Sequence, residues 1–205
     1  MKKVILVLIL AVCLNANALF AGFALYGNFN YGGTVFLSTE SEYLKKTNSE
    51  AIDHKTLYEG FGVGIEYGDS FNQSMSYTAG FLYNGVREWL QYNVFYGNLI
   101  YRVDKYFYVF GGVNMPYAEN TTIVLNVKNN ESKQFKGRLK MEPILGGQVG
   151  MGFQAHDHVT LEVVFHLIHF RSESSLSSSI DNELVDINIE EVDASGLSMN
   201  LKYLF

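Results

Sequence analysis

The stretch GLSMNLKYLF, residues 196–205, is the part of the sequence that decides the fold. Every second residue in it is apolar, and in a β-strand alternate side chains point to the same face. The apolar face consists of Leu197, Met199, Leu201, Tyr203 and Phe205. The opposite face consists of Ser198, Asn200, Lys202 and Leu204 and is mostly polar. The pattern therefore predicts a strand with an apolar medium on one side and a polar one on the other.

Seven earlier stretches show the same alternation and predict seven further strands. They are residues 23–33, 60–67, 75–84, 89–103, 106–115, 145–154 and 159–168. In the second of these, glycines at every other position leave one face nearly bare. Eight strands is the smallest size known for a closed membrane barrel, and its interior can be filled by side chains alone.

The fourth stretch, WLQYNVFYGNLIYRV from Trp89, has an ambiguous phase. If Tyr92 and Val94 face outward, Asn98 faces outward too, although an amide suits the interior better. A β-bulge near Gly97 would reverse the phase and resolve the conflict. The phase of this strand therefore stays open, with a bulge as one solution, and ten strands instead of eight stays open as an alternative.

The connections between the expected strands alternate in length. Long polar connections cover residues 39–57, 117–138 and 172–193, and the shorter 85–88 belongs with them. The short connections are 68–72, 104–105 and 156–158. Long loops on one side of a sheet and tight turns on the other are typical of extracellular loops and periplasmic turns of membrane barrels.

The N-terminus has the pattern of a cleaved secretory signal. Lys2 and Lys3 precede an apolar run over residues 4–14, and Ala16-Asn17-Ala18 is a small-x-small site for signal peptidase. The run is too short to span a bilayer as a helix, which needs roughly 20 residues. We expect cleavage after Ala18, with Ala21 as the alternative. The only cysteine, Cys13, follows a poor match to a lipoprotein box.

Removal of residues 1–18 leaves one predicted barrel domain over residues 19–205. Without Lys2 and Lys3 the chain has 15 − 2 = 13 basic residues against 21 acidic ones, a net charge of −8. An acidic chain disfavours nucleic acid as a partner. The mature chain has no cysteine and therefore cannot form a disulfide bond.

An aromatic last residue preceded by apolar residues at every second position resembles the closing strand of bacterial outer-membrane β-barrels. The whole mature chain resembles the OmpA-like and OmpX-like eight-stranded proteins, without the peptidoglycan-binding domain that some of them carry. The resemblance implies an all-β, closed, antiparallel up-and-down barrel in the cell outer membrane, in contact with lipid and lipopolysaccharide. It also implies that the barrel assembly machinery recognises the terminal strand through Tyr203 and Phe205.

Three charged residues are expected inside the barrel. Glu162 and Lys202 face inward by parity on consecutive barrel strands, near their periplasmic ends, and Glu66 lies at a similar depth. Arg102 would join them if the fourth strand is bulged. One interpretation is a charged gate for solutes, and the other is a paired polar core that only fills the lumen. Because eight strands leave little open bore, we favour the filled lumen.

The five histidines do not form a convincing metal or catalytic pattern. His156 and His158 flank Asp157 in a predicted turn without an evident third ligand, and His166 and His169 have opposite parity. Barrel enzymes that modify lipid A need a His with a nearby Ser, and the residue two after His169 is Arg171. We therefore expect no enzyme activity, no cofactor and no metal.

The long loops contain alternating apolar residues that suit sheet extensions beyond the membrane. These are Ile123, Leu125 and Val127 in one loop and Val185, Ile187 and Ile189 in another. An exposed sheet edge there could add a strand from a partner, or the basic and acidic loops could hold each other. The sequence thus favours a non-enzymatic barrel with a structural or surface-interaction, adhesin-like role toward a host or surface ligand. A small-solute channel and a lipid A-modifying enzyme are the alternatives.

Overall fold

The computed structural model describes residues 22–33, 36–40, 60–86, 92–118, 121–128, 132–180 and 183–205, and every regular element among them is a β-strand. Among these residues no helix is long and apolar enough to cross a membrane. The expected signal peptide with Cys13, and His54 in the first long loop, lie outside the described residues.

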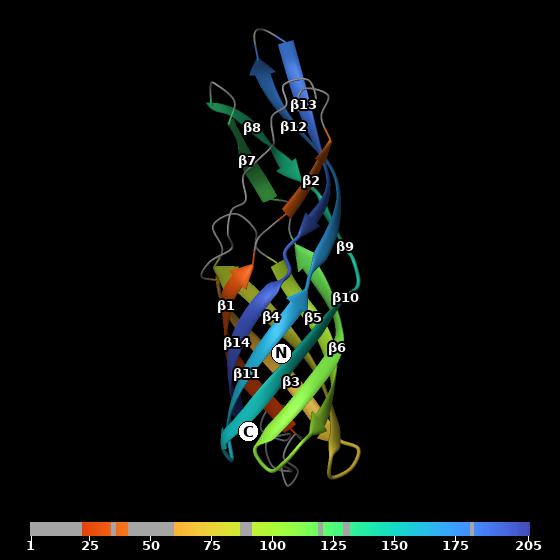
Figure 1. Ribbon diagram of the computed structural model, residues 1–205, viewed down its shortest axis with the longest axis vertical. Coiled ribbons are helices and arrows are strands. Elements are labelled where there is room, and N and C mark those ends of the chain that lie inside the picture. The colour runs from red at the N-terminus through yellow and green to blue at the C-terminus, as the bar shows by residue number, and fades with distance from the viewer. Residues whose placement is uncertain are drawn as a thin grey trace, which may run out of the picture.

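Eight strands close into an antiparallel barrel (Figure 1). They are β1 (Gly22–Gly33), β3 (Gly60–Ser70), β4 (Met75–Val86), β5 (Tyr92–Arg102), β6 (Phe107–Ala118), β10 (Gly146–His156), β11 (Val159–Leu167) and β14 (Gly196–Leu204). Around the barrel they follow the order β1-β14-β11-β10-β6-β5-β4-β3, and β3 pairs with β1 to complete the ring. The C-terminal strand closes the barrel by pairing Ala24 with Leu204 through Asn30 with Ser198. The predicted fold class and strand number are confirmed.

The outer face of the barrel is apolar, as the alternation predicts. Exposed outward residues include Leu25, Val63, Phe95, Leu99, Val113, Met151, Phe153, Val163, Leu201 and Tyr203. Between Phe107 and Tyr117, β6 spans about 33 Å of strand, or about 25 Å across a bilayer at the usual tilt. A band of this height matches the hydrocarbon thickness. In such a medium an unpaired strand edge costs several kcal/mol per amide, and closure removes that cost.

Three tight turns lie at the end of the barrel that also holds the C-terminus (Figure 1). They cover residues 71–74, 103–106 and 157–158. Asn72 Oδ1 accepts hydrogen bonds from the backbone N–H of Ser74 and Met75, and Asp104 Oδ1 from those of Tyr106 and Phe107. These bonds hold the pKa of the Asp104 carboxyl below its ordinary value.

The first of these turns lies later in the chain than the sequence predicted. Gly68, Asp69 and Ser70 were expected to form it, but they still pair with β4, through Ser70 opposite Ser76. The chain reverses only at Phe71 because Asn72 supplies the side-chain acceptor that stabilises the turn there.

The bulge that the sequence allowed near Gly97 in β5 is absent. β5 pairs without a register shift with β4 from Tyr92 to Tyr101 and with β6 from Tyr92 to Arg102. Tyr92 and Val94 face inward together with Asn98, and all three are buried. The structure thus determines the phase that the sequence left open, with Tyr92 and Val94 inward. Both faces of this strand carry large apolar residues, so hydrophobicity alone does not indicate its phase.

Above the barrel rim, strands continue into a second sheet, here called the outer sheet. It has the order β2-β13-β12-β8-β7, with β9 paired to β12. Its strands are β2 (Phe36–Glu40), β7 (Thr121–Lys128), β8 (Ser132–Leu139), β9 (Met141–Pro143), β12 (His169–Ile180) and β13 (Glu183–Asp193). The expectation that residues 117–138 and 172–193 contain hairpins that continue the sheet beyond the membrane is confirmed.

The outer sheet is continuous with the barrel strands on one side of the barrel (Figure 1). The neighbouring barrel strands β1, β14, β11 and β10 lead in the same order into β2, β13, β12 and β9. The break between the two sheets is bonded: Ala194 N donates to Ile168 O at 2.8 Å, and Ile168 N donates to Ser195 Oγ at 3.0 Å. The outer sheet is therefore anchored to the barrel by hydrogen bonds across the break.

An apolar layer lies at this break, above the polar lumen. Phe170 and Val192 are fully buried, Ile168 and Ile189 are 1% exposed, and the ring of Tyr92 lies 6.0 Å from that of Phe170. Burial of large aliphatic and aromatic side chains stabilises by about 1.5–3 kcal/mol each. This layer packs the base of the outer sheet against the top of the barrel.

Candidate functional site

Three buried charged side chains meet in the lumen, and we call them the lumen triad: Glu66 on β3, Glu162 on β11 and Lys202 on β14. Lys202 Nζ lies 2.9 Å from Glu162 Oε1 and 2.8 Å from Glu66 Oε2. Their side chains are at most 6% exposed. One ammonium group thus bridges two carboxylates that come from opposite directions in the lumen.

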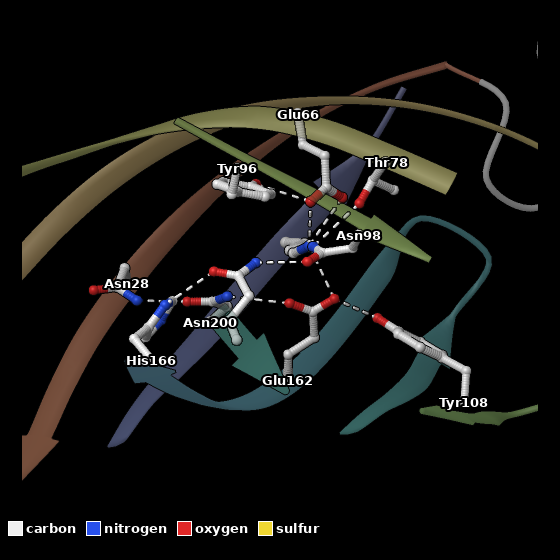
Figure 2. Close-up of polar contacts among 11 residues, drawn as sticks. Asn28, Glu66, Thr78, Tyr96, Asn98, Tyr108, Glu162, His166 and Asn200 are labelled. Atoms are coloured by element: carbon white, nitrogen blue, oxygen red, sulfur yellow. Dashed lines mark hydrogen bonds and ion pairs between the residues drawn. The ribbon is translucent and has the colours of Figure 1, made fainter. Parts of the chain in front are cut away.

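Neutral donors complete the coordination of both carboxylates (Figure 2). Tyr96 OH donates to Glu66 Oε2 at 2.8 Å, and Tyr108 OH donates to Glu162 Oε1 at 2.7 Å. Asn200 Nδ2 donates to Glu162 Oε2 at 3.1 Å, and Asn200 Oδ1 accepts from Asn28 Nδ2 at 2.6 Å. Buried charges are tolerable when their remaining lone pairs are hydrogen-bonded, and these donors provide that.

A second polar group lies in the same lumen, around His166. Its Nδ1 lies 3.1 Å from Gln148 Oε1 and its Nε2 lies 2.9 Å from Ser198 Oγ. Gln148 Nε2 donates to Asn98 Oδ1 at 2.7 Å, and Asn98 Nδ2 donates to Thr78 Oγ1 at 3.3 Å. Side chains thus connect all eight barrel strands across the lumen, and β4 takes part through Thr78 (Figure 2).

Aromatic rings fill the space that inward glycines leave. A Cβ at Gly64 would overlap the ring of Tyr26, one at Gly80 that of Tyr96, and one at Gly152 that of Tyr108. Each ring and its glycine are paired across neighbouring strands: Tyr26 with Gly64, Tyr96 with Gly80, Tyr108 with Gly152. The glycines let each ring lie against the barrel wall. The hydroxyls of Tyr96 and Tyr108 reach the carboxylates of the lumen triad. The ring of Tyr26 instead lies 5.3 Å from Lys202 Nζ.

The structure places the remaining predicted residues as follows. Arg102 is half-buried at the end of β5, next to the turn at residues 103–106. Tyr203 and Phe205 are exposed on the outer face with ring centroids 5.1 Å apart, and Phe205 N donates to Phe23 O at 2.9 Å. Ile123, Leu125 and Val127 lie on β7, and Val185 and Ile187 on β13. Ile189 belongs to the buried apolar layer, so it is not presented at the surface.

The described histidines lie apart from one another, except for the pair in the last turn. His156 and His158 are exposed there, with ring centroids 6.4 Å apart. His169, at the foot of β12, lies 3.7 Å from Asp193 Oδ1. Among the described residues no group of three or more His, Cys, Asp or Glu side chains is arranged to hold a metal ion.

Sequence reasoning missed the tyrosines and amides that serve the lumen triad. Alternation placed Asn200 on the same polar face as Lys202, but it does not say which residue on another strand Asn200 meets. That information depends on the stagger between strands, which alternation within one strand does not contain.

No protein-family model and no curated protein matches the chain. Solved structures do resemble it in fold. The outer membrane protein OprG from Pseudomonas aeruginosa is 12% identical, with 90% of this chain and 96% of that chain covered and a TM-score of 0.44. The attachment invasion locus protein Ail of Yersinia pestis, in complex with the heparin analogue sucrose octasulfate, is 13% identical over 89% and 99%, with a TM-score of 0.42.

A third solved structure, the outer membrane protein AlkL in lipid bilayers, is 14% identical over 91% of this chain and 92% of that chain, with a TM-score of 0.40. The sequence identities and TM-scores are low, so the fold is assigned from the strand order, the closure and the apolar outer face of this chain itself. It has the fold of a small eight-stranded outer-membrane barrel.

Proposed function

We propose that the protein is a non-enzymatic outer-membrane barrel with a closed lumen, whose work is done by the outer sheet at the cell surface. In this proposal the barrel is an anchor and the outer sheet makes an adhesin-like contact with a host or surface ligand. Export through the cleaved signal peptide of residues 1–18, and recognition of Tyr203 and Phe205 by the barrel assembly machinery, are parts of the same proposal.

The continuity of the barrel wall with the outer sheet is the observation that carries it. Four neighbouring barrel strands lead into sheet strands, and β12 alone adds 12 residues, which is about 40 Å of strand beyond the membrane. A barrel that served only to fill the membrane would not need such an extension. The hydrogen-bonded break and the buried layer beneath the outer sheet support a fixed presentation of this surface.

The filled lumen weighs against the alternative of a small-solute channel. Lys202 is held by two carboxylates, and tyrosine rings occupy the wall around it. A solute would have to separate buried ion pairs, and removal of one partner of such a pair costs about 3–5 kcal/mol.

Trimming of the outer sheet tests the proposal. Ser174 pairs with Ile189 and Thr121 with Leu139, so residues 175–188 and 122–138 can each be replaced by an Asn-Gly turn between paired strands. Both the full chain and the trimmed chain are expressed in a non-adherent Gram-negative strain, and the heat-dependent electrophoretic mobility of each verifies that the barrel is folded.

We expect cells with the full chain to adhere to matrix-coated surfaces or cultured host cells, and cells with the trimmed chain to lose this adhesion. Equal adhesion of cells with the full chain and cells with the trimmed, folded chain would overturn the proposal.

A further inference from the structure

The ladder between β6 and β10 stops before the rim of the barrel. Its last pair toward the outer sheet is Asn114 opposite Gly146. The chain that precedes Gly146 joins the outer sheet instead, because β9 pairs with β12 alone in the described part of the chain. β9 stays beside the end of β6, with Cα atoms of the two strands within 8 Å of each other. We call the unpaired stretch between residues 115–118 and residues 141–145 the seam.

The only two prolines of the sequence, Pro116 and Pro143, lie on the two sides of the seam. Successive residues of a strand direct their backbone N–H and C=O groups to opposite sides. Gln154 N on β10 donates to Tyr106 O, and β6 pairs with β5 without a register shift. Even-numbered residues of β6 therefore direct their backbone groups to the β10 side, and Pro116 directs its own into the seam.

On the other side of the seam, β9 directs its even-numbered residues to β12. Ile144 N donates to His169 O, and Lys140 N donates to Ser174 Oγ. The odd-numbered Pro143 therefore directs its backbone groups toward β6. Proline has no N–H, so neither proline leaves a donor unpaired where the ladder is interrupted. The two prolines thus lower the cost of leaving this part of the wall unpaired.

The seam lies within the apolar band of the outer face. Tyr117 marks the end of that band on β6, and the ladder stops three residues earlier, at Asn114. Three residues correspond to about 10 Å of strand, or about 7 Å of membrane depth at the usual tilt. Met115, Tyr117 and Leu145 flank the seam and are 40%, 55% and 61% exposed. The medium that the seam meets from outside is therefore hydrocarbon.

The inner side of the seam is apolar. Pro143 pairs with Phe170, and directly paired residues share one face of a sheet. Phe170 is fully buried, whereas Pro143 is exposed. Behind the seam the ring of Phe170 meets that of Tyr92, with centroids 6.0 Å apart, and the two rings come from the strands that flank β9 and β6. A group that covers Pro143 would therefore extend the buried apolar layer.

We propose that an acyl chain of a membrane lipid inserts into the seam and covers Pro143, in place of the strand contact that is missing there. An acyl chain is the occupant that the depth of the seam and its apolar flanks select. A strand from another protein would find no N–H donor at Pro116 or Pro143, and water would have to enter the hydrocarbon region. This lipid site goes beyond the proposed surface contact, and it attaches the foot of the outer sheet to the membrane.

Tryptophan reporters test the inference in the full-length chain. Trp89→Phe removes the only tryptophan. In that background Phe170→Trp gives the seam reporter, Phe110→Trp gives a lumen reporter behind a wall that is paired on both sides, and Phe95→Trp gives an outward reporter. Each chain is refolded into phosphatidylcholine vesicles with plain or brominated acyl chains, and heat-dependent electrophoretic mobility verifies folding. Quenching by the brominated chains and by aqueous iodide is measured.

We expect brominated chains to quench the seam reporter nearly as much as the outward reporter and far more than the lumen reporter, with little quenching by iodide. Quenching of the seam reporter by brominated chains no greater than that of the lumen reporter would overturn the inference. Strong quenching by iodide would also overturn it, because water would then occupy the seam. If Phe170→Trp does not fold, Tyr92→Trp reports from the other side of the seam with the same expectations.

A second variant tests the part assigned to the prolines. Pro116→Val with Pro143→Val gives each side of the seam an N–H that can pair with the other side. We expect this change to lower the quenching of the seam reporter by brominated chains to the level of the lumen reporter. Unchanged quenching in the folded variant would overturn the assignment of the prolines.

The lipid site and the proposed function can fail separately. A seam reporter that is shielded from brominated chains would remove the lipid site and leave the adhesion assay unaffected. Equal adhesion of cells with the full and the trimmed chain would remove the adhesin-like role and leave the quenching result unaffected.

Discussion

Lys202 is the residue on which the charge balance of the lumen depends. It is 4% exposed and lies within 2.9 Å of two carboxylates. Its removal leaves Glu66 and Glu162 buried without a counter-charge, whereas removal of Glu162 leaves Lys202 paired with Glu66. The two substitutions are therefore not equivalent, although they break the same ion pair.

We predict that Lys202→Met destabilises the barrel by about 3–5 kcal/mol and more than Glu162→Gln does. In the double variant the cost should be less than the sum, with a coupling of about 0.5–3 kcal/mol. Urea unfolding in lipid vesicles measures the free energy of unfolding of the two single variants and the double variant. Lys140→Met is the control, since Lys140 forms an exposed pair with Glu142 at 3.6 Å and such pairs contribute about 0–1 kcal/mol. Additive effects would mean that Glu162 and Lys202 do not interact.

Glycines of the two barrel faces should respond differently to the same change. We predict that Gly64→Ala destabilises by about 1–3 kcal/mol, because its Cβ would overlap the ring of Tyr26. Gly97→Ala is the matched control on the outer face, where the nearest atom to a Cβ is 3.8 Å away. It should be neutral or stabilising by up to about 1 kcal/mol. Equal losses in the same unfolding assay would contradict the packing of Tyr26 on Gly64.

At the scale of the strands, the sequence predicted the apolar faces that contact lipid. It did not predict the features that depend on register between neighbouring strands. Lipid requires an apolar side chain at every second position, so the outer faces of β10, β11 and β14 could be read from alternation. The phase of β5 could not, because Tyr92 and Val94 fill the lumen while Phe95 and Leu99 face lipid. The pairing of glycines with rings depends on register between strands. The joining of the two hairpins into one sheet depends on the pairing of β12 with β8 and β9, for example Ser177 with Lys136 and Phe170 with Pro143.

The terminal strand should matter for assembly beyond its contribution to stability. We predict that Phe205→Ala lowers the yield of folded barrel in outer-membrane fractions well below that of Phe71→Ala. Both side chains are exposed aromatics, but Phe71 lies in a turn, outside the strand that the assembly machinery is proposed to recognise. Matching yields of the two variants would remove the role assigned to Phe205.

At the scale of the whole molecule, the proposed function assigns anchoring to the barrel with its filled lumen and surface contact to the outer sheet. The lumen connects the eight strands through the lumen triad and the group around His166, and its described inward side chains are almost all buried. The outer sheet instead presents charged side chains, among them Arg171, Glu190 and Glu191. A channel would require an open lumen and would not need the outer sheet.

The most direct test is the conductance of single molecules of residues 19–205 refolded into planar lipid bilayers. Insertion is verified on the same preparation by heat-dependent electrophoretic mobility and protection from protease. We predict no steady conductance step for the inserted wild-type chain, because the ion pairs of Lys202 and the surrounding rings close the lumen. A reproducible, ohmic step with each wild-type insertion would contradict the closed barrel.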